Sequence, residues 1–268
     1  MIRSVPSPDG ELLPSCDKPF LMPVSASAAD SPRPWSQWRG HALVVGPGGI
    51  GQALLAALPE RAPHLRLWSA GRGQGDLRVD LEDPDSLEAF GQQVVRELAP
   101  LRLVICAAGL LHDGGLQPEK RLSQVKADAL RRSFAVNAWG PLLLAQAVEA
   151  ALPREEPVQL ASLSARVGSI GDNRLGGWYA YRAAKAAQNQ LLRTLALEWR
   201  RRLPLACVTL LHPGTTATAL SQPFRASVAP PNLFAPERAA RHLLDVLERQ
   251  TPDTSGSFLA WDGQTIPW

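Results

Sequence analysis

A tyrosine and a lysine four residues apart, Tyr181 and Lys185, form the pair with the clearest chemical meaning in this sequence. On a helix this spacing places both side chains on one face. A phenol is a poor acid or base at neutral pH because its reference pKa is about 10, but a nearby ammonium lowers that pKa. Such a tyrosine can exchange a proton with a carbonyl or alcohol oxygen while hydride moves to or from a nicotinamide.

A glycine-rich segment supplies the complementary feature, a place for a dinucleotide. It has the spacing G-x-G-x-x-G, follows an apolar run at 42–45 and precedes a helical pattern at 50–58. Glycines there permit a tight turn and let the backbone approach a pyrophosphate at a helix N-terminus. The pattern predicts dinucleotide binding by Gly46, Gly48, Gly49, Ile50 and Gly51.

The residues after the next strand bear on which dinucleotide binds. An acidic residue there accepts hydrogen bonds from the ribose 2′-hydroxyl of NAD, but this chain reads Ser69-Ala70-Gly71-Arg72. Arg72 can pair with a 2′-phosphate, which favours NADP(H) and makes NAD(H) the less favoured alternative; otherwise it is a solvated loop arginine. Asp80 contacts the adenine ring or only caps the following helix.

Apolar runs separated by helical patterns set the expected fold. Continuous apolar strands are typical of a parallel sheet covered on both faces. We therefore predict an α/β fold, a single doubly wound Rossmann-type domain at 39–268. Residues 1–38 are rich in Pro and Ser and are expected to form a disordered tail. The predicted strands are 42–45, 65–68, 77–81, 101–107, 158–162, 206–211 and 258–261; the predicted helices are 50–58, one from 83–85 onward, 130–152, 179–200 and 236–249.

These motifs, with three others, occur in the order seen in short-chain dehydrogenases/reductases, which the chain resembles from about residue 40 onward. The others are Ala107-Ala108-Gly109, Asn137 and Pro213-Gly214-Thr215. The phrases at 164–170, 176–179 and 258–263 resemble the branch of the C-factor signalling protein and the sniffer-type carbonyl reductases.

The resemblance implies a role for each matching residue. Tyr181 is the expected general acid/base, and Lys185 holds the nicotinamide ribose and depresses the pKa of the tyrosine. Asn137 anchors a water relay from an irregularity in its helix; the alternative is a polar residue that satisfies local backbone. The implied cofactor contacts are Ala107, Ala108 and Gly109 on the ribose side, and Pro213, Gly214 and Thr215 near the carboxamide.

Two departures from the family pattern stand out. The first two motif glycines of the family are separated by three residues, whereas here two residues separate Gly46 from Gly49. The family's carbonyl-polarising serine stands three residues before Gly168, where this chain has Ala165. We expect the adjacent Ser164 to replace it, with Ser169 and Ser162 as alternatives; a missing donor costs on the order of a hundredfold in rate.

Composition excludes several other classes. A net charge of +3 without a basic stripe argues against nucleic acid as a partner, and no run approaches the ~18 apolar residues of a membrane helix. Three distant cysteines without metal spacing indicate free thiols, no metal site and a cytoplasmic protein. The family implies a homodimer or homotetramer.

The leading function hypothesis is an NADP-dependent reductase of a small-molecule carbonyl or alcohol substrate. Trp178, Leu220, Phe224 and Phe234 suggest a lipophilic or aromatic substrate, or else ordinary core and subunit contacts. The alternative, favoured by Ala165, is a nucleotide-binding regulatory or signalling protein of the C-factor type with vestigial catalysis.

Overall fold

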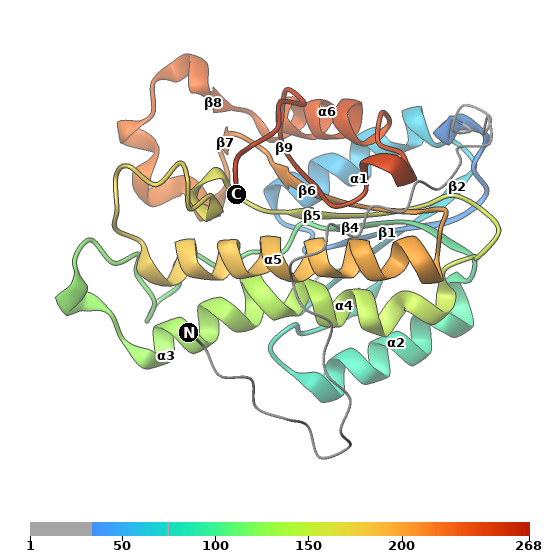
Figure 1. Cartoon of the computed structure of the whole chain (residues 1–268), viewed down its shortest axis with the longest axis horizontal. Coiled ribbons are helices and arrows are strands. Elements are labelled where there is room, and N and C mark those ends of the chain that lie inside the picture. Colours follow the sequence, from blue (N-terminus) through green and yellow to red (C-terminus); the bar gives the residue numbers. More distant parts are fainter. Residues whose placement is uncertain (1–33, 74) are drawn as a thin grey trace, which may run out of the picture. The chain divides into compact units, whose positions relative to one another are not determined.

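Seven parallel strands form one sheet in the computed structural model, which describes residues 34–73 and 75–268 (Figure 1). Their spatial order is β3-β2-β1-β4-β5-β6-β9, so the chain reverses its direction of travel across the sheet between β1 and β4. This order confirms the predicted doubly wound α/β fold. The strands are β1 (Gly40–Val45), β2 (Leu65–Gly71), β3 (Leu77–Arg78), β4 (Leu101–Cys106), β5 (Val158–Leu163), β6 (Ala206–His212) and β9 (Ser257–Ala260).

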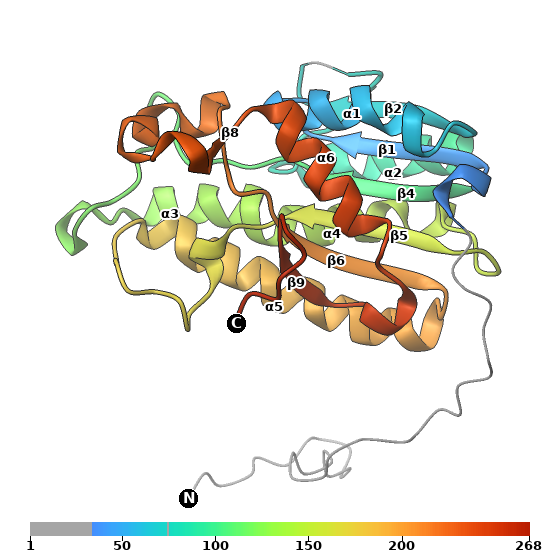
Figure 2. The same cartoon turned by 90° about the horizontal axis from the view of Figure 1, so that it is seen from above.

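Helices cover both faces of the sheet (Figure 2). On one face α1 (Gly49–Arg61) packs against α6 (Pro236–Leu247). On the other lie α2 (Pro84–Leu98), α4 (Gly140–Val148) and α5 (Tyr179–Arg202), with α4 between the other two. Every residue of β4 and β5 is buried, as expected for central strands that pack against helices on both sides.

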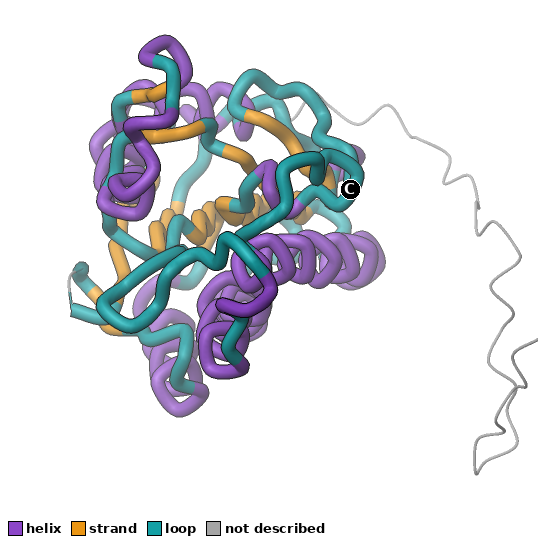
Figure 3. The backbone as a smooth tube through the Cα atoms, turned by 90° about the vertical axis from the view of Figure 1, so that its left-hand side faces the viewer, coloured by secondary structure: helices purple, strands orange, loops and turns teal. Residues whose placement is uncertain are grey.

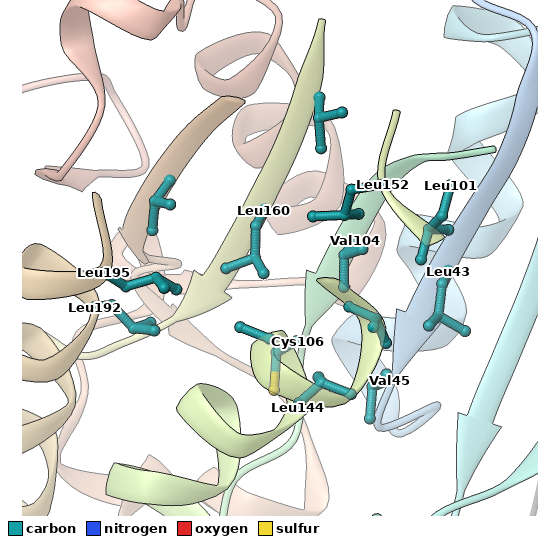
Figure 4. Packing of buried hydrophobic residues seen from close by; sticks show 14 of the residues in the cluster. Leu43, Val45, Leu101, Val104, Cys106, Leu144, Leu152, Leu160, Leu192 and Leu195 are labelled. Carbon is teal, nitrogen blue, oxygen red and sulfur yellow. The ribbon is translucent and has the colours of Figure 1, made fainter. Parts of the chain in front are cut away.

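Two apolar cores result, because neighbouring residues of a strand face opposite sides of the sheet. On the α1/α6 face, Val44 and Ile105 pack in the core that contains Leu54 and Leu243. On the opposite face the strands pack against α4 and α5, and Figure 4 shows Leu43, Val45, Val104, Cys106 and Leu160 there with Leu144, Leu192 and Leu195.

The predicted helix at 130–152 is interrupted, which corrects the sequence analysis. It consists of α3 (Ala127–Phe134), a π-helical turn at Ala135–Trp139, α4 and a short 3₁₀ turn at Glu149–Ala151. Pro141 explains the interruption: it has no N–H to donate to the carbonyl of Asn137 four residues earlier, so the α-helical ladder cannot continue there.

The folded domain begins before residue 39, which corrects the predicted tail boundary. Trp35 starts a 3₁₀ turn, and both Trp35 and Trp38 are 3% exposed and belong to the core on the α1/α6 face. Burial of two indoles outweighs the local Pro/Ser-rich composition. The rest of the predicted tail, residues 1–33, lies outside the described residues.

Small elements gather beyond the carboxyl ends of the strands, on the side that faces the viewer in Figure 3. They are β7 (Thr215–Thr216), which pairs with β8 (Leu233–Phe234), and a 3₁₀-helical segment at Ala219–Ser227. The sequence analysis did not predict them. The described residues between β2 and β3 contain no helix, and the sequence analysis had placed none there.

Candidate active site

A cleft of about 580 Å³ lies at the carboxyl ends of β1, β2, β4, β5 and β6, where the strand order reverses. Parallel α/β sheets bind ligands at this position because two neighbouring connections leave the sheet in opposite directions. The structure brings most of the predicted site residues together here. The cleft is lined by Gly46, Gly48, Gly49, Ile50, Gly51, Arg72, Asp80, Ala107, Ala108, Gly109, Ser164, Tyr181, Lys185 and Pro213.

Close contacts require glycine at two positions of the loop, and a third glycine faces open space. Gly46 has φ +87°, and a Cβ there would lie 2.5 Å from the amide nitrogen of Ala108. A Cβ at Gly51 would lie 2.2 Å from the carbonyl oxygen of Gly46, so the helix could not pack as closely on the loop. Gly48 faces open space within 4 Å, which leaves room for a ligand. The shortened loop therefore retains a cradle for a dinucleotide.

The N-terminus of α1 is open to an anion. Gly48 caps the helix without a side-chain hydrogen bond, and the first turn carries no acidic residue. The first amide groups of a helix lack intrahelical acceptors and carry partial positive charge. A pyrophosphate fits these donors without competition from a carboxylate.

A network of charges lies at the rim of the cleft near the ends of β2 and β3. The Arg72 guanidinium lies 3.5 Å from Glu82, and its side chain is 65% exposed. Glu82 also receives a hydrogen bond from Nε of Arg132 at 3.3 Å. Asp80 accepts a hydrogen bond from the amide of Glu82, which turns its carboxylate toward this rim. Arg72 is thus held beside the cleft by an exposed, easily exchanged ion pair.

Tyr181 and Lys185 project from the first two turns of α5, as predicted. Lys185 Nζ lies 5.8 Å from the centre of the Tyr181 ring. It donates hydrogen bonds to the carbonyl oxygen of Leu163 at 2.8 Å and to Oε1 of Gln188 at 2.9 Å. The ammonium is therefore anchored on the sheet side of the helix.

Burial controls the ionisation of both groups. It raises the pKa of Tyr181 far above its ordinary value, and no charged neighbour offsets the shift. Burial also lowers the pKa of Lys185 to about 8. The predicted depression of the Tyr181 pKa by Lys185 is therefore not found, because desolvation of the phenolate outweighs the attraction of an ammonium that is itself desolvated.

Asn137 lies inside the π-helical turn, at the irregularity that the resemblance implied. Its side chain is completely buried and does not line the cleft. Oδ1 accepts a hydrogen bond from the amide of Leu110 at 2.9 Å, and Nδ2 donates to the carbonyl oxygen of Leu110 at 2.6 Å. The side chain thus fixes the loop after β4, whose residues Ala107–Leu111 form one wall of the cleft.

The structure shows which of the candidate serines adjoins the cleft in place of the hydroxyl missing at Ala165. Ser164 lines the cleft, whereas Ala165 does not. The Ser164 hydroxyl donates to Oδ1 of Asn189 at 2.6 Å. The two alternatives are engaged elsewhere: Ser162 accepts from Gln188 and Ser169 accepts from the amide of Asp172. Of the three, only Ser164 adjoins the cleft, and its proton points away from it.

Thr218 lines the cleft, although the sequence analysis gave it no individual role. The cleft includes Pro213 and Thr218, but neither Gly214 nor Thr215, which had been predicted. Thr215 pairs with Leu233 in the small sheet, and Gly214 (φ +73°) packs near Phe234, which accounts for their displacement from the cleft. The sequence offers several hydroxyl side chains after Pro213-Gly214, and the sequence analysis selected Thr215 rather than Thr218.

Aromatic side chains gather beside Tyr181. Trp178 lies 6.3 Å from Tyr181 and 5.0 Å from Phe224, between ring centres. The backbone of Trp178 has φ +53°, in the left-handed region that residues other than glycine seldom adopt. Phe234, by contrast, packs on Trp261 and His242 and is structural.

A second missed residue, Glu119, holds the start of α5. Its backbone carbonyl accepts from the amide of Trp178. Its buried carboxylate accepts from the amide of Ala180 at 3.2 Å and so caps the helix that carries Tyr181. Nothing in the local sequence marks this contact, which spans 61 positions of the chain.

The described ranges contain no helix with the length and apolarity needed to cross a membrane. Among residues 34–73 and 75–268, no three histidine, cysteine or acidic side chains are grouped so as to hold a metal ion.

A doubly wound sheet, a glycine loop at its switch point and a Tyr-x-x-x-Lys pair in one cleft define a dinucleotide-binding oxidoreductase fold. The family model for short chain dehydrogenases matches residues 69–229. A 1-hydroxy-2-glutathionyl-2-methyl-3-butene dehydrogenase from Rhodococcus sp. is 32% identical over 192 residues, which cover 71% of this chain and 78% of the relative. The chain belongs to the short chain dehydrogenase family.

Two further comparisons concern the relatives that the sequence analysis named; the first is a similarity in sequence, and the second shows a shared fold. The C-signal protein of Myxococcus xanthus is 34% identical over 148 residues, which cover 55% of this chain and 83% of the relative. The structure of the carbonyl reductase Sniffer of D. melanogaster matches with a TM-score of 0.72 and 21% identity, over 86% of this chain and 100% of that one.

Proposed function

We propose that this protein is an NADP(H)-dependent oxidoreductase that transfers hydride between nicotinamide and a carbonyl or alcohol substrate. The observation that carries the proposal is that Tyr181 and Lys185 line the same cleft as the glycine loop. One continuous site therefore presents a dinucleotide cradle and a general acid/base. The Rhodococcus relative, by its name, is a dehydrogenase of a hydroxy compound, which supports this reaction class.

Arg72 supports NADP(H) over NAD(H). It lines the cleft after β2, and its side chain is exposed enough to exchange Glu82 for a 2′-phosphate. A phosphate is the better partner because guanidinium binds it through two parallel hydrogen bonds. Asp80, on the same rim, is the proposed adenine contact.

Tyr181 is the proposed proton donor in reduction. NADP(H), when bound, supplies the hydride. The high pKa that burial gives Tyr181 keeps the phenol protonated at neutral pH, so its hydroxyl can donate to the oxygen that gains charge. Lys185 contributes its remaining N–H donor and its charge on the cleft side. Tyr181 is therefore in the protonated state that reduction requires.

The neighbouring side chains favour a lipophilic or aromatic carbonyl compound. The Trp178 ring lies beside Tyr181 and packs against Phe224, and Leu220 lines the cleft. Apolar walls bind apolar substrates and exclude water from the reacting atoms.

NADPH and NADH oxidation with a panel of aromatic and aliphatic aldehydes and ketones tests the proposal. We expect NADPH oxidation, and a loss on the order of 10²–10⁴ in kcat for Tyr181→Phe, because the phenylalanine has no proton to donate. Binding of NADPH, measured by calorimetry, should survive this substitution. Equal turnover by wild type and Tyr181→Phe would contradict the assignment of Tyr181.

A regulatory nucleotide-binding protein is the second candidate. Ala165 removes the family's hydroxyl, and the Ser164 proton is bonded to Asn189 instead. The similarity to C-signal supports this alternative. Tight NADPH binding without turnover on any carbonyl compound would favour it over the reductase.

We further propose a homodimer or homotetramer in the cytoplasm. Trp139 and Leu197, on the segments that contain Asn137 and Tyr181, are 40% and 45% exposed and offer apolar area to a second subunit. The two cysteines within the described residues, Cys106 and Cys207, are free and buried, which suits a reducing compartment.

A further inference from the structure

The amide side chain of Gln188 lies fully buried on α5, three residues after Lys185. Its Oε1 accepts a hydrogen bond from Lys185 Nζ, which also donates to the carbonyl oxygen of Leu163. An ammonium has three N–H donors. These two contacts use two of them on the sheet side and leave a third, and Lys185 is among the residues that line the cleft.

The orientation of this amide is fixed by its partners. Lys185 can only donate, so the atom that faces it must be the amide oxygen. Nε2 then donates to the hydroxyl of Ser162 at 2.7 Å and approaches the carbonyl oxygen of Leu163 at 3.4 Å. Gln188 and Lys185 therefore share one acceptor on β5, a fully buried central strand.

We propose that Gln188 is a positioning residue for Lys185, which holds Nζ in place and stabilises its charged form in a site without a carboxylate partner. This role rests on the proposed function of Lys185. The titratable groups that face the ammonium are Cys106 on β4 and Tyr181 on α5. Neither is an anion at neutral pH, because burial raises the pKa of both. The two carbonyl-type oxygens of Gln188 and Leu163 are thus its stabilising partners.

The proposal predicts opposite shifts in two variants. Gln188→Met removes the acceptor at similar length, so the pKa of Lys185, already lowered to about 8 by burial, should fall further by about one unit. Gln188→Glu places an anion beside the ammonium and should raise that pKa. Gln190→Met, on the exposed side of the same helix, is the matched control and should leave it unchanged.

Lysine NMR of the full chain without cofactor measures this pKa directly. The chain has four lysines, Lys18, Lys120, Lys126 and Lys185, so ¹³C-labelled lysine gives few signals, and Lys185→Arg identifies the one required. A fall with Gln188→Met and a rise with Gln188→Glu support the proposal. No shift, or shifts in the same direction, would overturn it.

The pH profile of kcat/KM for NADPH-dependent reduction gives the second readout. Deprotonation of Lys185 should end activity at high pH. The high-pH limb of the profile should therefore move to lower pH in Gln188→Met and to higher pH in Gln188→Glu. If Gln188 were only structural, both variants would lose activity without opposite shifts of the high-pH limb. A limb that stays at the same pH in both variants would overturn the proposal. Shifted NMR titrations in a protein without turnover would instead place the failure in the proposed function.

Ser162→Ala keeps the test decisive if Gln188→Met fails to fold. It leaves Gln188 in place but removes the acceptor that orients its amide, so a smaller fall of the Lys185 pKa is expected. An unchanged pKa in a folded Ser162→Ala protein, together with an unchanged pKa in Gln188→Glu, would contradict the positioning role.

Discussion

At the residue scale, the most consequential detail is which hydroxyl faces the substrate. Ser164 adjoins the cleft, but its single proton is used by Asn189, and the neighbouring position is alanine. A carbonyl oxygen that gains charge needs a donor. Ser164 can supply it by rotating away from Asn189, or by accepting from Asn189 Nδ2, which has no hydrogen-bond partner in the present orientation of that amide.

Ser164→Ala and Ala165→Ser separate the two possibilities. If Ser164 polarises the carbonyl, Ser164→Ala should lower kcat on the order of a hundredfold. If it serves only Asn189, Ser164→Ala should cost about 1–3 kcal/mol of stability and little rate, while Ala165→Ser should raise kcat. Steady-state kinetics and urea denaturation of both variants measure these effects. A hundredfold loss in Ser164→Ala without loss of stability would exclude the purely structural role.

At the scale of elements, the start of α5 decides where Tyr181 stands. The residue that caps the helix, Trp178, has a left-handed backbone and makes no side-chain capping bond. The missing acceptor comes from Glu119, far away in the sequence. A carboxylate at a helix N-terminus is favourable both as an acceptor and through the helix dipole.

Glu119→Ala should therefore weaken both stability and catalysis. Loss of a cap costs about 0.5–2 kcal/mol, and fraying of the first turn displaces Tyr181, so kcat should fall with the melting temperature. Glu119→Gln keeps an acceptor oxygen and should lose less of each. Glu155→Ala, at an exposed position, is the control. Calorimetry and kinetics should show the largest losses for Glu119→Ala, smaller ones for Glu119→Gln and none for Glu155→Ala. Equal effects of Ala and Gln at position 119 would show that the charge alone matters.

Elements that depend on local sequence were predictable, whereas contacts between distant residues were not. Strands, long helices and the glycine loop follow from local periodicity and spacing, so the sheet and the positions of Tyr181 and Lys185 were predictable. The contacts of Glu119 with Ala180 and of Gln188 with Ser162 join residues distant along the chain, and no local pattern encodes them. The π-helical turn was predictable in principle from Pro141, but the apolar run around it reads as one continuous helix.

At the scale of the whole molecule, two bases with lowered pKa values make stability depend on pH. Burial, with the nearby Arg166, lowers the pKa of His212 to about 4, and its Nδ1 has no hydrogen-bond partner. Between pH 4 and about 6.5 the unfolded chain binds a proton at this residue and the folded protein does not. Stability must therefore rise with pH across that window. For Lys185 the same argument gives a rise between pH 8 and about 10.5.

Substitution of His212 should flatten the acid part of this dependence. His212→Asn cannot titrate, so the difference in unfolding free energy between wild type and variant should change by on the order of 1–3 kcal/mol from pH 6.5 to pH 4. Carboxyl groups titrate in the same range, but they contribute equally to both proteins and cancel in the difference. Urea denaturation at intervals of half a pH unit provides the measurement. Parallel curves would mean that folded His212 takes up its proton as readily as the unfolded chain, which its buried, unpartnered nitrogen argues against.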